Sequence, residues 1–152
     1  MTAAVLDCVV DAGVGIKLCI TEPDSALADA LLALAAASPP TELYVPDLFY
    51  IECANIWWKH VQRLGLPRAK AERDMQKLCA LRLHRTATAD LAVDALQIAL
   101  DHTISAYDAS YVALSGRLGL PLITADDALI RKLAASHFVL KRLTDLSLPP
   151  TP

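Results

Sequence analysis

Short apolar runs, several of them rich in β-branched residues, alternate along this 152-residue chain with longer segments rich in alanine and leucine. The short runs fit buried strands, and the longer segments fit helices. Regular alternation of the two is typical of an α/β fold, because crossover helices cover both faces of a parallel sheet. The pattern therefore predicts an α/β fold.

The runs and the residues that end them locate the expected elements. We expect strands over residues 5–11, 81–86, 121–124 and 138–143. We expect helices over about 24–37, 48–64, 67–79, 89–101, 106–118 and 126–135. Gly65 and Gly119 end two helices, and Pro67 opens another, since proline is tolerated in a first turn. Residues 44–47 are interpreted as the lead-in to helix 48–64, and helix 67–79 as a solvated arm.

Length and composition favour a single cytoplasmic domain. We expect residues 1–148 to form that domain and residues 149–152, Pro-Pro-Thr-Pro, to be a frayed tail. The hydrophobic content of 55% leaves room for a core and for a subunit interface, so we expect a homodimer. Asp7 and Asp11 stand where a signal peptide would be apolar, and the apolar run 30–37 is far shorter than the roughly 20 residues that span a bilayer. We therefore expect no membrane segment.

The net charge of −3 does not by itself indicate a nucleic-acid-binding protein. Acids neutralised by bound metal would leave a less negative surface, and several cations are then free to form a local basic rim. These cations are Lys17, Lys59, Arg63, Arg131, Lys132, Lys141 and Arg142. Of these, we consider Lys17, Lys59 and Arg63 as phosphate contacts, against the alternative of ordinary solvated charges.

Four segments, at 8–12, 49–54, 105–110 and 122–127, each set carboxylates among apolar or small residues. Ionised carboxylates are almost never buried without a cation or a metal. The acids at issue are Asp11, Glu52, Asp108 and Asp126. Asp11 and Asp126 follow strands, at the edge where α/β sheets bind ligands. A divalent cation is the simplest single partner for all four.

Each acid also has a purely structural explanation. Asp108 lies in the first turn of an expected helix, where the helix dipole favours a carboxylate. Glu52 is harder to explain, because it shares a helix face with Leu48, Phe49, Asn55 and Ile56 that we expect to point to the core, and no basic partner stands at helical spacing. Asp127 is expected to cap the following helix, and Asp7 and Asp47 to be surface or capping residues.

Mg²⁺ and Mn²⁺ suit such a site better than zinc does. Four carboxylates within about 5 Å of one another would repel by roughly 3 kcal/mol per pair at an effective dielectric near 20. Carboxylates and waters are the ligands of hard cations, whereas zinc prefers nitrogen and sulfur. The histidines show no ligand spacing, and Cys8, Cys19, Cys53 and Cys79 show no CxxC spacing and are interpreted as core residues. A carboxylate cluster with one or two such ions is suited to phosphodiester cleavage.

Four motifs in order, from Val9 to about Leu143, make the chain similar to PIN-domain ribonucleases. The motifs are Val9-Val10-Asp11-Ala12 with Lys17; Val45-Pro46-Asp47-Leu48 leading to Glu52-Cys53-Ala54-Asn55 and Trp58-Lys59; Ala106-Tyr107-Asp108-Ala109 with Tyr111 and Ala113-Leu114; and Leu122-Ile123-Thr124-Ala125-Asp126. The chain resembles in particular the VapC type, the toxins of bacterial and archaeal toxin-antitoxin pairs. Gly13 departs from the pattern, since the family usually carries Ser or Asn there.

The resemblance implies a fold, a site and its partners. The implied fold is a PIN-like three-layer sandwich with a central, mostly parallel sheet flanked by helices. It implies that Asp11, Glu52, Asp108 and Asp126 are catalytic and bind Mg²⁺ or Mn²⁺, one or two ions per site. Thr124 and Asn55 are then expected to support the site by hydrogen bonds. It further implies an RNA substrate, and a VapB-like antitoxin in a groove formed by the early helix and segment 48–64.

Two functions remain in competition. The first is a Mg²⁺- or Mn²⁺-dependent endoribonuclease; the second is a non-catalytic PIN-type module that binds RNA or protein, motivated by Gly13 and the modest basic charge. An aspartyl-phosphate enzyme built on Asp11 is disfavoured, because Gly13 stands where dehalogenase-like phosphatases place a second acid. Trp57 and Trp58 are expected in the core or at a dimer interface, with base stacking as the less favoured role. Tyr107 and Tyr111 are expected to pack.

Overall fold

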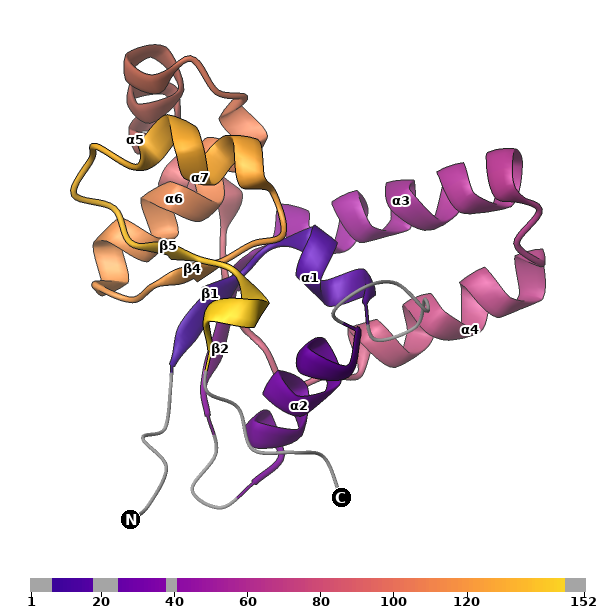
Figure 1. Ribbon diagram of the computed structural model, residues 1–152. Coiled ribbons are helices and arrows are strands. Elements are labelled where there is room, and N and C mark those ends of the chain that lie inside the picture. The colour runs from indigo at the N-terminus through magenta and orange to yellow at the C-terminus, as the bar shows by residue number, and fades with distance from the viewer. Residues whose placement is uncertain (1–6, 18–24, 38–40, 147–152) are drawn as a thin grey trace.

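The central sheet of the computed structural model is built from five parallel strands in the order β3-β2-β1-β4-β5 (Figure 1). The structure describes residues 7–17, 25–37 and 41–146. The strands are β1 (Cys8–Val10), β2 (Leu43–Pro46), β3 (His84–Thr86), β4 (Leu122–Ile123) and β5 (Leu140–Lys141). The register sets Val9 beside Tyr44 on one side and beside Leu122 on the other. β1 is thus the middle strand, and all of its residues are buried.

Helices cover both faces of this sheet. They are α1 (Ala12–Ile16), α2 (Ser25–Ala35), α3 (Leu48–Leu64), α4 (Arg68–Cys79), α5 (Thr88–His102), α6 (Ala106–Leu118) and α7 (Asp127–Leu133), followed by the 3-10 helix η1 (Leu143–Asp145). Figure 1 shows α5, α6 and α7 on one side of the sheet and α1 and α2 on the other. The α3–α4 hairpin projects away from the body as an arm. The predicted fold class, an α/β sandwich with a parallel sheet, is confirmed.

Burial explains why these segments adopt their structures. The strands β1, β2 and β4 contribute fully buried apolar residues to one core. In α3, Phe49, Cys53 and Trp57 recur every four residues and form its buried stripe. Helix α1 packs against α3 at Gly15, where an added Cβ would lie 2.5 Å from the Phe49 ring. Only glycine allows this close approach, which brings the start of α1 against the start of α3.

Several expected boundaries agree with the structure, and others were wrong. The bounds 48–64 and 106–118 are those of α3 and α6, with Gly65 and Gly119 in left-handed conformation after them. Residues 44–47 were expected to lead into a helix, but most of them belong to β2. Helix α1 was not predicted, and strands β3, β4 and β5 are shorter than expected. Residues 5 and 6 of the first expected strand lie outside the described part.

The arm and the cysteines also correct the sequence interpretation. Helix α4 was expected to be wholly solvated, yet it buries Asp74 and Leu78. Cys8 and Cys53 are buried as predicted, whereas Cys79 is exposed. Cys19 lies outside the described residues. Among the described helices, none is long and apolar enough to cross a membrane.

Thr103, the residue after α5, has a strained left-handed backbone conformation, whereas glycine occupies the corresponding positions after α3 and α6. It adopts a left-handed backbone (φ 55°), while the equivalent position after α6 is Gly119 (φ 65°). A β-branched residue is disfavoured in this region, and Gly is the usual residue after a helix. We therefore expect Thr103→Gly to raise the free energy of unfolding by about 0.5–1 kcal/mol. Urea unfolding measures the change, and Gly119→Thr, the reverse exchange, should lower stability; a less stable T103G protein would contradict the argument.

Candidate active site

The sheet order reverses between β1 and β4, and the candidate site lies at their carboxyl ends. At such a switch point the connections leave in opposite directions and open a crevice where α/β proteins bind ligands. Asp11 directly follows β1, and its backbone N–H donates to the carbonyl of Ile123 in β4 (3.3 Å). Its side chain also caps α1, because Oδ1 accepts from the N–H of Val14 (2.9 Å). The carboxylate is therefore fixed at both its backbone and its side chain.

Thr124 connects the two strand ends. It is completely buried after β4, and its hydroxyl is hydrogen-bonded to the Asp11 carboxylate. The same hydroxyl oxygen accepts from the N–H of Asp126 (3.0 Å). One threonine thus orients two of the four candidate acids, which is the kind of contact expected for it.

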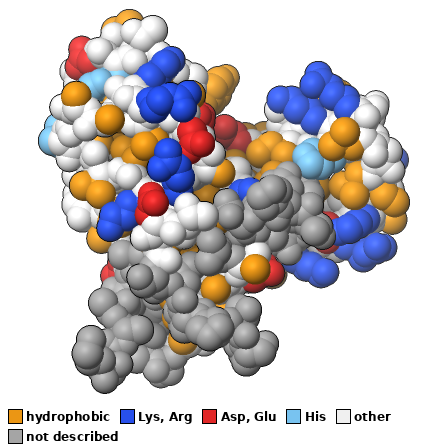
Figure 2. All heavy atoms as spheres, viewed as in Figure 1, with side chains coloured by type: hydrophobic (Ala, Val, Ile, Leu, Met, Phe, Trp, Pro, Cys, Tyr) orange, Lys and Arg blue, Asp and Glu red, His pale blue; other side chains and the backbone are white. Residues whose placement is uncertain are grey.

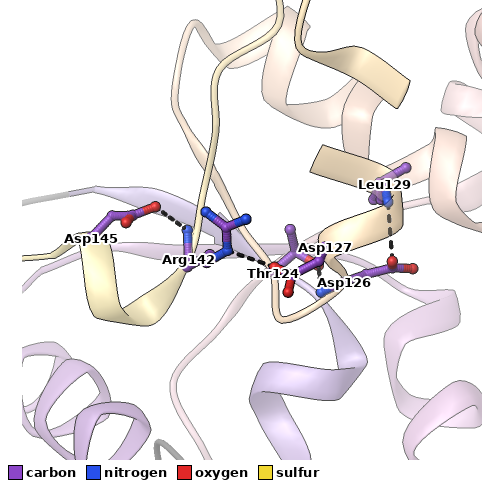
Figure 3. A network of polar contacts seen from close by, with 6 residues as sticks. All are labelled: Thr124, Asp126, Asp127, Leu129, Arg142 and Asp145. Atoms are coloured by element: carbon purple, nitrogen blue, oxygen red, sulfur yellow. Dashed lines mark hydrogen bonds and ion pairs between the residues drawn. The ribbon is translucent and has the colours of Figure 1, made fainter. Parts of the chain in front are cut away.

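Asp126 caps α7, whereas the sequence interpretation gave that role to Asp127. Asp126 Oδ1 accepts from the N–H of Leu129 (3.0 Å), as the dashed line in Figure 3 shows. Asp127 instead pairs with Arg142, whose own N–H donates to Asp145 (2.9 Å). The expectation of an Asp127 cap was therefore wrong, because the preceding residue already has the extended backbone of an N-cap. The second oxygen of Asp126 has no hydrogen bond in this network.

Glu52 obtains its partner from α6. The Tyr111 hydroxyl donates to Glu52 Oε1 (2.7 Å), although Tyr111 was expected only to pack. Its ring is buried, and Glu52 is half-buried at the edge of the stripe formed by Phe49 and Cys53. The expected core-directed face at Glu52 is thus a boundary, with Asn55 exposed. The spacing carried a signal for this contact, since Tyr111 lies three residues after Asp108 on one face of α6.

Asp108 lies in the first turn of α6, as expected. Its N–H donates to the hydroxyl of the N-cap residue Ser105 (3.1 Å), and its side chain is half-buried. Lys132 of α7 lies close enough to lower its pKa. Ser105 is the N-cap of α6, and a hydrogen bond from its side chain also lowers the pKa of the Asp108 carboxyl, more than Lys132 does.

Burial and mutual repulsion raise the pKa values of Asp11, Glu52 and Asp108. Burial raises the pKa of Asp11 to about 6, with smaller contributions from Asp108 and Glu52, although the hydrogen bonds from Thr124 and Val14 oppose the shift. Burial likewise raises the pKa of Glu52, against the Tyr111 hydrogen bond and with help from Asp108. The pKa of Asp108 is raised by burial and, to a smaller extent, by Asp126. The four acids therefore form one electrostatically coupled group.

This group fits a hard divalent cation by its chemistry, although its side chains do not converge on a single point. No three His, Cys, Asp or Glu side chains among residues 7–17, 25–37 and 41–146 are arranged so that they could hold a metal ion. All four donors are carboxylates, and a cation would relieve both their repulsion and their desolvation.

The other candidate residues occupy different places. Asn55 lines a hollow beside Glu52, and no hydrogen bond between these two side chains is seen. Lys17 is buried, so it is not part of an exposed basic rim. Lys59 and Arg63 are exposed on α3, with Arg63 in its last turn on the arm. At Gly13, an added Cβ would lie 3.4 Å from Asp11 Oδ1, an ordinary contact, so the missing polar side chain leaves open space beside Asp11.

Fold and site together define an α/β protein with an acidic cluster at the switch point of a parallel sheet. The family model described as the PIN domain matches residues 8–135. This match covers most of the chain, which therefore belongs to the PIN domain family. The resemblance based on the four motifs is confirmed.

Relatives agree with this assignment. The chain is 36% identical to Ribonuclease VapC3 of Pyrobaculum aerophilum over 131 residues, covering 84% of this chain and 95% of the relative. A crystal structure from the same organism has a TM-score of 0.65 at 23% identity, covering 94% of this chain and 88% of the other. VapBC2 of Rickettsia felis, bound to a promoter DNA fragment, has a TM-score of 0.66 at 10% identity, covering 90% and 98%. At these identities the two solved structures support the fold.

Replacing Asp11 should make the metal-free protein more stable near neutral pH. Because the pKa of Asp11 is raised from 3.8 to about 6, the folded state binds the proton more tightly and its stability falls as the pH rises through this window. Asp11→Asn keeps a cap acceptor and removes the charge, so we expect a gain of about 2 kcal/mol at pH 7.5 that disappears near pH 4. Denaturant unfolding of both proteins in EDTA, repeated between about pH 4 and pH 7.5, measures this difference in the free energy of unfolding.

The matched control for this experiment is Asp47→Asn. Hydrogen bonds from Thr88 lower the pKa of Asp47, so its charge stabilises the folded state. We expect that variant to lose stability at neutral pH and to resemble the wild type at low pH. A D11N protein with wild-type stability at all pH values would contradict the assignment of a desolvated Asp11 charge.

Removing the Tyr111 hydroxyl should raise the pKa of Glu52 directly. Tyr111→Phe deletes a hydrogen bond to the ionised carboxylate, so the pKa of Glu52 should rise further above its ordinary value. A carboxyl-detected NMR titration measures this pKa directly. Tyr44→Phe is the control, because Tyr44 stacks on His84 in a different part of the sheet. An unchanged Glu52 titration in Y111F would show that the hydrogen bond does not form in solution.

Proposed function

We propose that this protein is a Mg²⁺- or Mn²⁺-dependent endoribonuclease and the toxin of a VapBC-type toxin-antitoxin pair. The observation that carries the proposal is the electrostatically coupled group of four carboxylates at the switch point, in which burial and neighbouring acids raise the pKa of Asp11. Membership of the PIN domain family and 36% identity to Ribonuclease VapC3 support the reaction and its substrate. We propose RNA phosphodiesters as the bonds that it hydrolyses.

The roles of the residues follow from their contacts. Asp11, Glu52, Asp108 and Asp126 would hold one or two ions. A cation held by these carboxylates would supply activation of the attacking water and stabilisation of charge on the leaving oxygen. Thr124 keeps Asp11 and Asp126 in register through its two hydrogen bonds.

Tyr111 and Asn55 have separate supporting roles in this proposal. Tyr111 fixes Glu52 by its 2.7 Å hydrogen bond. Asn55 stands at the mouth of the site, where its exposed amide is available to the substrate.

Charge on either side of the acids supports an approach by RNA. Figure 2 shows acidic side chains in the hollow between the lobe of α5–α7 and the α3–α4 arm, with basic side chains on both shoulders. The exposed cations of the arm include Lys59, Arg63 and Arg68, and those of the lobe include Arg131 and Lys132. Two basic shoulders would attract the phosphates on either side of the bond placed over the acids. Lys17 is not assigned this role because it is buried.

The proposed partners are a VapB-like antitoxin and a second copy of the chain, in the cytoplasm. A toxin-antitoxin complex from Klebsiella pneumoniae has a TM-score of 0.61 to this chain at 16% identity, covering 89% of this chain and 97% of that one. An apolar hollow between α3 and α4, lined by residues that include Trp57, Val61 and Met75, supports a groove for an amphipathic antitoxin segment. The groove was expected between the early helix, α2, and segment 48–64, whereas the lining of this hollow comes from α3 and α4.

The function is tested by cleavage of a panel of structured RNAs. We expect Asp108→Asn to lower Mg²⁺-dependent cleavage at least about 100-fold, since a bound cation contributes several kcal/mol to the transition state. Asp127→Asn is the matched control; it should stay within about threefold of wild type, because its exposed pair with Arg142 contributes little. Calorimetry with Mn²⁺ should show binding that D108N weakens. Full activity in D108N would refute the site, and the absence of any metal binding would favour the non-catalytic module.

A further inference from the structure

A hollow of about 570 Å³ opens directly beside the acidic group, and it is unusually rich in exposed aromatic surface. It is lined by Ile51, Glu52, Ala54, Asn55, Trp58 and Tyr107. Ile51, Trp58 and Tyr107 are 70%, 56% and 67% exposed, although large hydrophobic side chains are normally covered. The volume lies in the range of about 300–1,000 Å³ that is typical of small-molecule sites.

The hollow is continuous with the candidate site through two residues. Glu52 belongs to both, since it lines the hollow and is electrostatically coupled to Asp11 and Asp108. Tyr107 immediately precedes Asp108 at the start of α6. Figure 2 shows hydrophobic and acidic side chains together in the depression between the arm and the lobe. A group bound here would therefore lie next to the bond over the acids.

We propose that this hollow is a subsite for an unpaired nucleobase next to the cleaved phosphodiester. Trp58 and Tyr107 come from different elements, α3 and α6, and offer ring faces for stacking, while the exposed Asn55 amide offers both a donor and an acceptor for a base edge. Aromatic stacking plus edge recognition is how proteins read single-stranded RNA. The inference rests on the proposed nuclease function and specifies its substrate as RNA with a splayed-out base at the cleavage site.

Charge disfavours the main alternative, in which a second copy of the chain covers this surface. An apolar protein face over the hollow would seal Glu52 from water, and an unpaired buried carboxylate is strongly disfavoured. A nucleotide leaves the site open to water and to the cation that RNA brings with it, so it covers the aromatic rings without isolating the carboxylate.

The two tryptophans of this chain allow a direct measurement. Trp57 is buried, and its Nε1 has no hydrogen-bond partner among the described residues, so Trp57→Phe loses no such bond. That variant leaves Trp58 as the sole indole reporter. The background substitution Asp11→Asn prevents cleavage during the titration. The probes are short single-stranded oligoribonucleotides of each base and an abasic phosphodiester oligomer of equal length.

We expect the base-bearing oligomers to quench Trp58 fluorescence and the abasic oligomer to leave it nearly unchanged. In the same background, Tyr107→Leu should weaken binding about tenfold, because stacking on one ring contributes on that scale. Leu96→Ser, which removes an exposed apolar side chain from α5, should not change binding. If W57F proves unstable, the difference in quenching between wild type and Trp58→Phe gives the same information.

The outcomes separate this inference from the proposed function. Cleavage with no effect of Trp58→Ala or Tyr107→Leu would overturn the subsite and leave the nuclease standing. Base-dependent quenching without any RNA cleavage would support the subsite and count against the nuclease. Equal quenching by the abasic oligomer would overturn the subsite, because only phosphate would then be recognised. Conversion of an oligomer to monomers by W58A in sedimentation velocity would also overturn it and assign the face to a subunit interface.

Discussion

Desolvation of the Asp11 carboxylate is the interaction on which the rest of the site depends. Its position after the middle strand places it among buried residues, and the fold supplies two neutral hydrogen-bond donors, Thr124 and Val14. Such donors orient a charge but only partly replace water. Two other acids, Glu52 and Asp108, approach from opposite layers of the sandwich, and their charges raise the pKa of Asp11 further. The folded chain thus maintains a destabilised anionic site that a cation would relieve.

The sheet topology explains how four distant acids reach one edge. β1 and β4 are adjacent, and each ends with a carboxylate or its supporting threonine. Helix α3 enters from one face and α6 from the other, so Glu52 and Asp108 approach the strand ends from two sides. The Tyr111–Glu52 hydrogen bond links these two helices directly. Since α1 must pack closely on α3, Gly15 is part of the same arrangement: a Cβ there would push the start of α3 away from Asp11.

The sequence predicts the fold class well because the periodicity of apolar residues indicates which segments are buried. Its predictions of individual strands and helix caps fail where the backbone conformation, and not burial, decides the structure. Strand β2 was overlooked because it ends in Pro46, and proline argues against a central strand, yet Pro46 sits at the last pair with Thr86, where its missing N–H is tolerated. The cap of α7 was assigned one residue late, because Asp126 and Asp127 are chemically identical and only backbone geometry distinguishes them.

The positions of the four acids could be predicted from motif order, but their partners could not. Tyr111 was expected to be a packing residue, and its ring is indeed buried. Only the structure shows that its hydroxyl donates a hydrogen bond to Glu52. The two tryptophans also differ in a way that the composition does not predict. Trp57 lies in the core, whereas Trp58 lines the hollow. Contacts across the sheet depend on relative helix positions, and these are set by the whole core. The pocket between α3 and α6 therefore combines side chains from two helices. The sequence of each helix, taken alone, indicates only an amphipathic helix. The proposed subsite would let specificity change through the exposed Trp58 and Tyr107 without disturbing the half-buried Asp11 carboxylate and the buried Thr124.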